Sequence, residues 1–267
     1  MSAAKPPVVM IHGAFCGSWV FEGWARCFRD AGYPVLTPDL RHHGAAADTT
    51  ALAGLGVLDY AEDLGCVIDG LADLPVIIGH SMGGLLAQML AARGKARALV
   101  LLAPVAPWGV WPSGLFELLS AQALFLAGDF WRRPIHPDRW LAACGLDSLE
   151  PEQRASTLSR LVPESGLAMF EILHWPFDLS RASFVDARHV ACPIMCVSGG
   201  QDPITPAGTV RRIARRYRGR AQYRELKGAS HWLVLEPGWE KLAEQTLFWL
   251  SRLHADAEAS QPDGRSA

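Results

Sequence analysis

Six short stretches of the chain read as apolar runs, without the alternation of apolar and polar positions that marks a half-buried strand. Such runs are typical of strands that are buried on both faces of a parallel sheet. We therefore expect six strands, each covered by helices on both sides of the sheet. They are Val8–His12, Pro34–Asp39, Pro75–His80, Ala98–Pro104, Pro193–Gly199 and Ala221–Leu226.

Helical periodicity fills the stretches between the predicted strands. Apolar residues three or four positions apart form one face of two of these helical segments. Repeated β-α units with right-handed crossovers predict an α/β fold built on a doubly wound, mostly parallel sheet. In such a sheet the ligand site lies at the carboxyl ends of the strands. The two helical faces consist of Tyr60, Leu64, Val67, Ile68 and Leu71, and of Leu242, Leu247, Leu250 and Leu253.

The alternation of strands and helices breaks between Val105 and Arg188. This segment has no clear strand, seven prolines divide it into short pieces, and it holds five of the ten tryptophans. We predict a helical cap at 105–187, inserted over the site between two core parts, 1–104 and 188–254, and a disordered tail at 255–267. A packed subdomain without a binding role would have a similar composition, so the substrate-lining interpretation has a plain alternative.

Composition narrows the functional classes. With 50% hydrophobic and 19% charged residues, the 267 residues fit one large α/β domain, or one domain with an insertion. The formal net charge of −2 gives no field that would attract nucleic acid or an anionic membrane. Four arginines share one helical face within 211–216, which we interpret as a solvated face. The oligomeric state is left open, and a homodimer is one of the states that the sequence allows.

The cysteines and the start of the chain indicate the compartment. The six cysteines lie at positions 16, 27, 66, 144, 192 and 196, without paired spacing, and we interpret them as reduced, buried thiols. The first residues run into a predicted strand without an apolar signal region. No apolar stretch reaches the roughly 18 residues that span a bilayer. We therefore expect a cytoplasmic protein that acts on a small molecule.

The clearest chemical signal is Gly79-His80-Ser81-Met82-Gly83, which ends a β-branched strand and opens a helical pattern. In the motif G-x-S-x-G the serine occupies a sharp, strained turn with its hydroxyl exposed above the sheet. The glycines are needed because the strand and the helix pass too close together for a Cβ. Ser81 is therefore the candidate nucleophile, and His80 is expected to pack behind it. A serine in an ordinary β-to-α turn is the alternative, which the strand before it and the helix after it disfavour.

A serine hydroxyl needs a base to take its proton, and the base needs an orienting acid. His231 lies in a loop between the last predicted strand and the C-terminal helix. Asp202 lies in the loop that follows the strand Pro193–Gly199. The order Ser81, Asp202, His231 is the chain order expected behind a G-x-S-x-G serine. An Asx turn or a helix cap would also explain Asp202, and a buried packing histidine would explain His231.

Backbone N–H groups must stabilise the oxyanion that forms during attack on a carbonyl. The amide of Met82, the residue after the nucleophile, is one candidate donor. The other is expected from the loop His12–Trp19, where Gly13 allows the turn; we favour the amide of Ala14, with Phe15 as the alternative. Three aromatic side chains near these elements are candidates for contact with the substrate. They are Phe15, Trp108 and Trp232.

With these residues the chain resembles a serine hydrolase of the α/β-hydrolase fold. The loop His12-Gly13-Ala14-Phe15-Cys16-Gly17-Ser18-Trp19, with Ala31–Val35 and Pro38–Leu40 after it, is similar to the methylesterase and hydroxynitrile-lyase branch. The resemblance implies a Ser–His–Asp triad and a mostly enclosed pocket for small esters. Hydroxynitrile lyases of this kind carry threonine at Gly13 and lysine at Trp232, which argues against a lyase. The segment Asp39–Gly44 also departs from the family's common Asp-x-x-Gly-x-Gly loop.

We expect an enzyme that hydrolyses a small carboxylic ester or lactone through an acyl-enzyme, with an apolar or aromatic substrate and no cofactor. The same triad would serve carbon–carbon bond hydrolysis, perhydrolysis or acyl transfer, because a fold does not settle a reaction. A slow-turnover small-molecule receptor is the alternative from a different class. Asp39, His42 and His43 do not predict a metal site, since neighbouring side chains in a loop rarely converge on one ion.

Overall fold

The computed structural model describes residues 5–44, 48–119, 128–137, 142–143, 146 and 149–259. Six strands form the central sheet in the order β2-β1-β3-β4-β7-β8, and every neighbouring pair is parallel. Each of the six predicted runs contains one of them, which confirms the α/β class. The strands are β1 (Val8–Ile11), β2 (Val35–Leu36), β3 (Val76–His80), β4 (Ala98–Leu102), β7 (Ile194–Gly199) and β8 (Ala221–Leu226).

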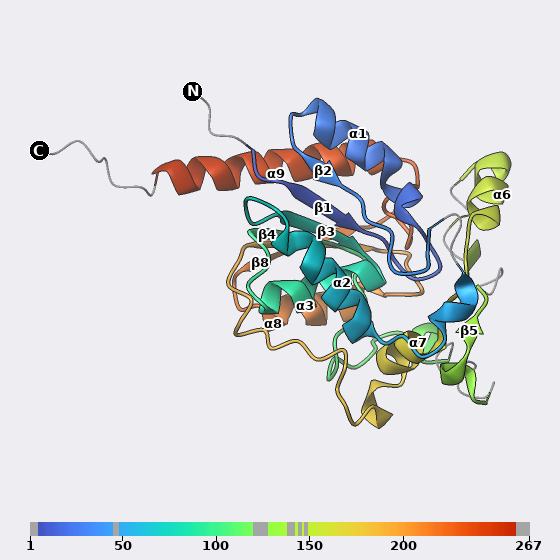
Figure 1. Cartoon of the computed structure of the whole chain (residues 1–267). Helices are drawn as coiled ribbons and strands as arrows, with labels where there is room; N and C mark the ends of the chain where they lie inside the picture. Colours follow the sequence, from blue (N-terminus) through green and yellow to red (C-terminus); the bar gives the residue numbers. More distant parts are fainter. Residues whose placement is uncertain are drawn as a thin grey trace, which may run out of the picture.

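Helices cover both faces of this sheet (Figure 1). Alternate residues of each strand point to opposite faces, so β1 sends Val8 and Met10 to one core and Val9 and Ile11 to the other. The first core is shared with α1 and α9, and the second with α2, α3 and α8. These helices are α1 (Glu22–Asp30), α2 (Val57–Asp69), α3 (Met82–Ala92), α8 (Ala207–Arg216) and α9 (Trp239–Ala259).

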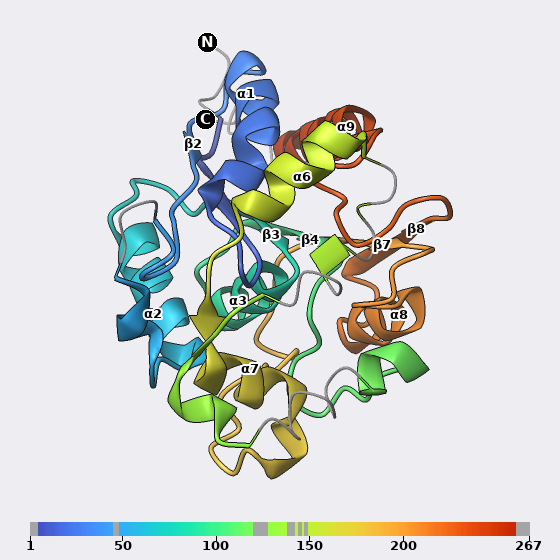
Figure 2. The same ribbon diagram turned by 90° about the vertical axis from the view of Figure 1, so that its right-hand side faces the viewer.

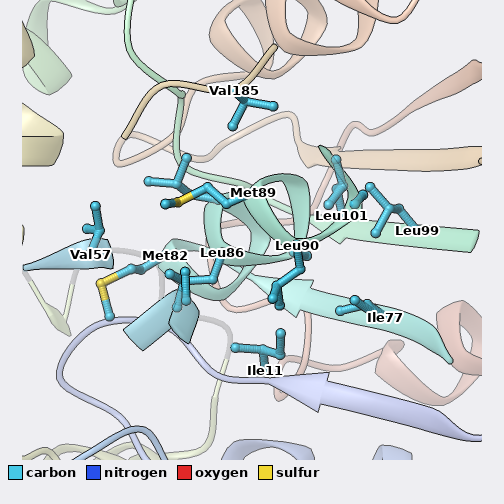
Figure 3. Close-up of a cluster of buried hydrophobic side chains, with 14 of the residues drawn as sticks. Ile11, Val57, Ile77, Met82, Leu86, Met89, Leu90, Leu99, Leu101 and Val185 are labelled. Carbon is cyan, nitrogen blue, oxygen red and sulfur yellow. The ribbon is translucent and has the colours of Figure 1, made fainter. Parts of the chain in front are cut away.

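Helix α3 packs within the second core (Figure 3). Its residues Met82 to Ala91 are all buried, which explains why the sequence after Ser81 is so uniformly small and apolar. Leu86 and Leu90 pack in one cluster with Ile11 and Ile77 of the sheet. Full burial of each such side chain contributes about 1.5–3 kcal/mol. The strand–helix unit that carries Ser81 is therefore anchored from all sides.

The edge strands depart from the prediction that all six strands are buried on both faces. In β8 the residues Gln222 and Arg224 are exposed and alternate with half-buried neighbours, because β8 is an outer strand of the sheet. The two residues of β2, at the other edge, are half-buried. Val67, which shares the predicted apolar face of α2 with Leu64 and Ile68, is 37% exposed.

Between β4 and β7 the chain leaves the sheet, and α6, β5 and α7 lie beyond one end of it, on the right in Figure 1 and toward the viewer in Figure 2. The predicted absence of strands in this segment is wrong, because β5 and β6 form a small antiparallel sheet. Two-residue strands held by a single pairing leave no periodic signal in a sequence. The elements are η3 (Phe130–Arg132), β5 (Pro134–Ile135), α6 (Pro151–Ser159), β6 (Glu164–Ser165), α7 (Gly166–Leu173) and η4 (Trp175–Phe177).

Two short 3-10 helices, η1 (Ser18–Phe21) and η2 (Thr49–Leu52), complete the described elements. Helix α9 continues to Ala259, so residues 255–259 of the predicted disordered tail are helical, and the rest of that tail lies outside the described residues. No helix in the described part of the chain is both long enough and apolar enough to cross a bilayer.

Among the cysteines, the prediction of buried thiols holds for Cys16 and Cys196 but is wrong for Cys66, which is exposed. Cys27 and Cys192 are half-buried, and Cys144 lies outside the described residues. All five described cysteines are free thiols.

Candidate active site

Ser81 stands on a strained turn between β3 and α3. Its backbone has φ 54° and ψ −119°, a combination that L-residues rarely adopt. The flanking glycines make the turn possible, because a Cβ on Gly79 would overlap the Gly83 carbonyl and one on Gly83 would overlap the Ile11 carbonyl. The strain is stabilised by the buried strand and helix on either side, and it leaves the serine side chain at the carboxyl end of β3.

An imidazole–carboxylate pair forms at the ends of the neighbouring strands. Nδ1 of His231 lies 2.9 Å from Oδ2 of Asp202, and both side chains are almost completely buried. The other carboxylate oxygen of Asp202 accepts the N–H groups of Ile204 and Thr205 at 2.8 and 2.9 Å. The Thr205 hydroxyl lies 2.8 Å from Oδ2. Asp202 is thus the predicted Asx-type turn residue and, at the same time, the partner of His231.

The electrostatics of Asp202 favour the ionised form. Burial alone would raise the pKa of Asp202, but the charge of His231 and the hydrogen bonds from His231 and Thr205 outweigh burial and lower that pKa below its ordinary value. A carboxylate that accepts the Nδ1–H of His231 holds the imidazole in the tautomer whose Nε2 can accept a proton. The described hydrogen bonds of the ring all involve Nδ1, which leaves Nε2 for a reaction partner.

Close backbone contacts bring the three candidate residues to one end of the sheet. His80, the neighbour of Ser81, has Nε2 2.9 Å from the backbone carbonyl oxygen of His231. The Thr205 hydroxyl also lies 3.0 Å from the carbonyl oxygen of Ala103, which follows β4. The amide of Val105 in turn donates to the Ser81 carbonyl over 3.0 Å. The loops after β3, β4, β7 and β8 are therefore tied together around one point.

The loop after β1 reaches the same point. A Cβ on Gly13 would lie 2.8 Å from the Cβ of Ser81, so Gly13 is in close contact with the candidate nucleophile. His12 fixes the start of this loop, since Nδ1 lies 2.9 Å from the Gly13 carbonyl oxygen and Nε2 accepts the amide of Leu40 over 3.0 Å. Burial, with His43 nearby, lowers the pKa of His12 to about 4. Ala14, which follows Gly13, is half-buried.

Met82 is the first residue of α3, where the backbone N–H groups have no acceptor within the helix. The positive end of the helix dipole adds to the attraction of these N–H groups for negative charge. Strand order reverses between β1 and β3, which is the switch point where ligands bind in sheets of this kind. The two predicted oxyanion donors, Ala14 and Met82, flank that point.

The three aromatic candidates lie in different surroundings. Phe15 is half-buried on the loop after β1, with a positive φ of 62°. Trp108 packs edge-on against Trp175 at 5.1 Å between ring centroids, in a cluster of the 105–187 segment. Trp232 is 5% exposed and lies in the core shared with α1 and α9, 6.1 Å from the His80 ring. Phe15 therefore shares a loop with Ala14 and Trp232 shares one with His231, whereas Trp108 lies in the 105–187 segment.

A buried cluster that the sequence did not reveal lies next to this site. The imidazole of His43 is 3.0 Å from the carboxylate of Glu164, a residue 121 positions away, and Tyr60 donates to the same carboxylate over 2.7 Å. A lone glutamate between a proline and a serine gives no sign of this in the sequence. The described part of the chain holds no group of three or more His, Cys, Asp or Glu side chains placed to bind a metal ion.

A six-stranded parallel sheet with a serine on a strained strand–helix turn, followed along the chain by an acid loop and a histidine loop, defines the class of α/β hydrolases. A profile of the alpha/beta hydrolase family matches residues 8–245. The chain belongs to that family.

Curated relatives include several esterases. The chain is 34% identical over 131 residues to a carbendazim hydrolyzing esterase of Nocardioides, an alignment that covers 45% of this chain and 52% of that protein. It is 29% identical over 230 residues to a pimeloyl-[acyl-carrier protein] methyl ester esterase of Neisseria meningitidis, covering 82% and 83%. It is 25% identical over 270 residues to a non-heme chloroperoxidase of Kitasatospora aureofaciens, covering 92% of both chains.

Solved structures share the fold at lower identity. An esterase from Exiguobacterium antarcticum superposes with a TM-score of 0.71 at 20% identity, over 93% of this chain and 92% of that one. A methylesterase from Arabidopsis superposes with a TM-score of 0.68 at 16% identity, over 92% and 98%. At these identities the superpositions establish the fold alone.

Proposed function

We propose that this protein is a serine hydrolase that cleaves a small carboxylic ester or lactone through an acyl-enzyme on Ser81. The observation that carries the proposal is the buried His231–Asp202 pair, 2.9 Å apart, in loops bonded to the turn that bears Ser81. A nucleophile on a strained turn, a base and an orienting acid are the three groups that acyl transfer needs.

In the proposed reaction, Nε2 of His231 takes the proton of the Ser81 hydroxyl as the oxygen attacks the substrate carbonyl. Asp202 accepts the Nδ1–H and stabilises the imidazolium that forms. The amides of Ala14 and Met82 donate to the oxyanion of the tetrahedral intermediate. Collapse of the intermediate transfers the proton from His231 to the leaving alcohol and leaves an acyl ester on Ser81. Water, activated by His231, then releases the acid and restores the serine.

The substrate is a small ester or lactone with an apolar or aromatic part. The esterase activities named for the Nocardioides and Neisseria relatives support ester hydrolysis. The 105–187 segment, as a cap over the carboxyl ends of the strands, is the proposed source of apolar contacts, with Trp108 among them. Phe15 and Trp232 are the proposed contacts on the core side. The proposed reaction uses neither metal nor cofactor.

A second candidate within the same chemistry is transfer of the acyl group to an acceptor other than water. The relative named as a non-heme chloroperoxidase covers 92% of this chain, which is the reason to test peroxide as the acceptor. Carbon–carbon bond hydrolysis of a diketone would use the same three residues. A slow-turnover small-molecule receptor remains the alternative outside enzymes.

The deciding experiment compares the wild-type protein with Ser81→Ala on p-nitrophenyl esters, lactones and vinylogous diketones. We expect turnover to fall by several orders of magnitude, on the order of 10⁴-fold or more, with an unchanged circular dichroism spectrum. A fluorophosphonate should label the wild-type serine rapidly and leave Ser81→Ala unlabelled. Undiminished ester hydrolysis by Ser81→Ala refutes the proposal, and a single turnover by the wild type indicates a receptor.

A further inference from the structure

The side chain of Glu164, on β6, is completely buried between three parts of the chain. One carboxylate oxygen accepts the Tyr60 hydroxyl of α2 and the amide of Ser165, both over 2.7 Å. The other oxygen faces Nε2 of His43, in the loop after β2, over 3.0 Å. A carboxylate without access to water needs several hydrogen-bond donors. His43 is the donor whose protonation sets the charge of the cluster.

The surroundings of His43 favour its positively charged form. Its Nδ1 lies 2.9 Å from the backbone carbonyl oxygen of Arg41, which can only accept, and its Nε2 faces the carboxylate of Glu164. Both ring nitrogens therefore carry a proton. Burial works against this charge, but the hydrogen bond and the charge of Glu164 outweigh burial and raise the pKa of His43. The same contacts act on Glu164. Burial alone would raise its pKa, but the hydrogen bond from His43 and the charge of His43 outweigh burial and lower it.

None of the other titratable groups described around the pair takes over the charge of His43 or of Glu164. His12 lies 5.4 Å from the His43 ring and is held neutral, since one nitrogen accepts an amide and the other donates to a carbonyl. Burial raises the pKa of both the Cys16 thiol and the Tyr60 hydroxyl, so they stay protonated. Asp39 is exposed and accepts the amide of Ser18 over 2.6 Å. His43 and Glu164 thus form an isolated buried ion pair.

This pair is joined to the loop that carries the candidate oxyanion donor. Two positions before Glu164, the amide of Val162 donates to the carbonyl oxygen of Phe15 over 3.0 Å. On the other side, His43 packs on His12, whose Nδ1–H holds the Gly13 carbonyl. The loop from Gly13 to Phe15 is therefore held from both ends, by groups that the ion pair brings together.

We propose that Glu164 is a positioning residue: through its ion pair with His43 it holds the segment 162–165 against the loop 13–15, and thereby sets the direction of the Ala14 amide. The inference rests on the proposed role of that amide in ester hydrolysis. It adds a dependence of turnover on a charge pair that touches neither the nucleophile nor the base.

The substitution Glu164→Gln isolates the charge from the shape. A glutamine keeps the acceptor for Tyr60 and Ser165, and its amide N–H donates to Nε2 of a neutral His43, so no polar group is left unpaired. We expect kcat to fall about tenfold to a hundredfold. Complete loss of an oxyanion donor lowers kcat more, by about 10²–10³-fold. KM should change by less than about twofold, because ground-state binding is unaffected.

The pH profile and the protonation of His43 separate positioning from a merely structural role. In the wild type, His43 loses its proton as pH rises through its raised pKa, and kcat should fall on this alkaline limb. In Glu164→Gln the limb should be absent. Nitrogen-15 NMR should report two protonated ring nitrogens for His43 in the wild type at neutral pH, and one in Glu164→Gln.

The matched control is Glu171→Gln. Glu171 is the second buried glutamate of this segment; it accepts the amide of Val57 over 2.7 Å, and no described hydrogen bond or ring contact links it to the loop 13–15. Burial raises the pKa of Glu171 to about 7, so it is partly protonated already and its substitution should leave kcat within about twofold.

Three outcomes overturn the inference: a neutral His43 in the wild type, an unchanged kcat in Glu164→Gln, or an equal loss in Glu171→Gln. If Glu164→Gln does not fold, the wild type still decides, since the titration of His43 by NMR and the alkaline limb of kcat must coincide. Failure of the proposed function is seen separately, as activity that survives in Ser81→Ala while the NMR result stands.

Discussion

The imidazole of His80 donates its Nε2–H to the backbone carbonyl oxygen of His231 over 2.9 Å, and the two rings lie 4.9 Å apart. The residue before the candidate nucleophile is thus bonded to the residue that carries the candidate base. Burial, with His231 nearby, lowers the pKa of His80 to about 3, so the ring is neutral at all pH values at which the protein would work. Its other nitrogen has no hydrogen-bond partner among the described residues.

Substitution of His80 by phenylalanine tests this bond. His80→Phe keeps a ring of similar shape but leaves the carbonyl of His231 unpaired, at a cost of about 1–3 kcal/mol. We expect kcat to fall by about 5- to 100-fold through displacement of His231, with a loss of thermal stability. Steady-state kinetics and thermal unfolding measure both effects. His189→Phe, at a side chain that is 70% exposed, is the control, and a kcat of His80→Phe equal to that of the control would contradict the role of the bond.

Asp202→Asn tests the orientation of the base. The side-chain oxygen of the asparagine would still accept the N–H groups of Ile204 and Thr205, so its NH₂ group must face Nδ1 of His231. The imidazole then carries its proton on Nε2 and cannot act as a base. We expect kcat to fall on the order of 10³–10⁴-fold without loss of the fold. Thr205→Ser, which keeps the hydroxyl beside Asp202, should remain within about tenfold; a fully active Asp202→Asn would exclude the assigned role.

The sequence predicted the elements whose constraints are local. Each predicted range contains one of the six strands, although Ala221–Leu226 includes Gln222, Arg224 and Glu225 and is not an apolar run. The glycines around Ser81 marked the turn, because only glycine fits where backbone passes backbone. What the sequence could not show are contacts between distant positions. Glu164 and His43 are 121 residues apart, and their pairing depends on β6, a strand of two residues. The exposed positions of β8, Gln222 and Arg224, are polar in the sequence, and their exposure matches the place of β8 at the sheet edge.

Two glycines near the histidine loop give a matched pair of substitutions. A Cβ on Gly199 would overlap the carbonyl oxygen of Ser230, whereas a Cβ on Gly228 would meet nothing within 4 Å. Gly199→Ala should push the loop before His231 away from Asp202, with a loss of stability of about 1–3 kcal/mol and a large loss of kcat. Gly228→Ala should be near neutral for both quantities. Chemical denaturation and kinetics on the two variants decide, and equal behaviour of the two would show that the close contact at Gly199 is unimportant.

The buried neutral histidines should make the fold sensitive to acid. Burial lowers the pKa of His12 to about 4 and that of His80 to about 3, from 6.5 in the unfolded chain. Below about pH 6.5 the unfolded chain therefore binds two protons that the folded chain does not, and the free energy of unfolding falls as pH falls.

The expected slope is about 1.4 kcal/mol per pH unit for each of the two histidines, over the window from about pH 6 down to about pH 4. Denaturant titrations at pH 7, 6 and 5 measure it. His80→Phe should reduce the slope by about half, because one proton is removed from the difference, whereas His189→Gln, at an exposed side chain, should leave the slope unchanged. A free energy of unfolding that stays constant between pH 7 and pH 5 would mean that His12 and His80 can be protonated in the folded protein, against the hydrogen bonds described for both rings.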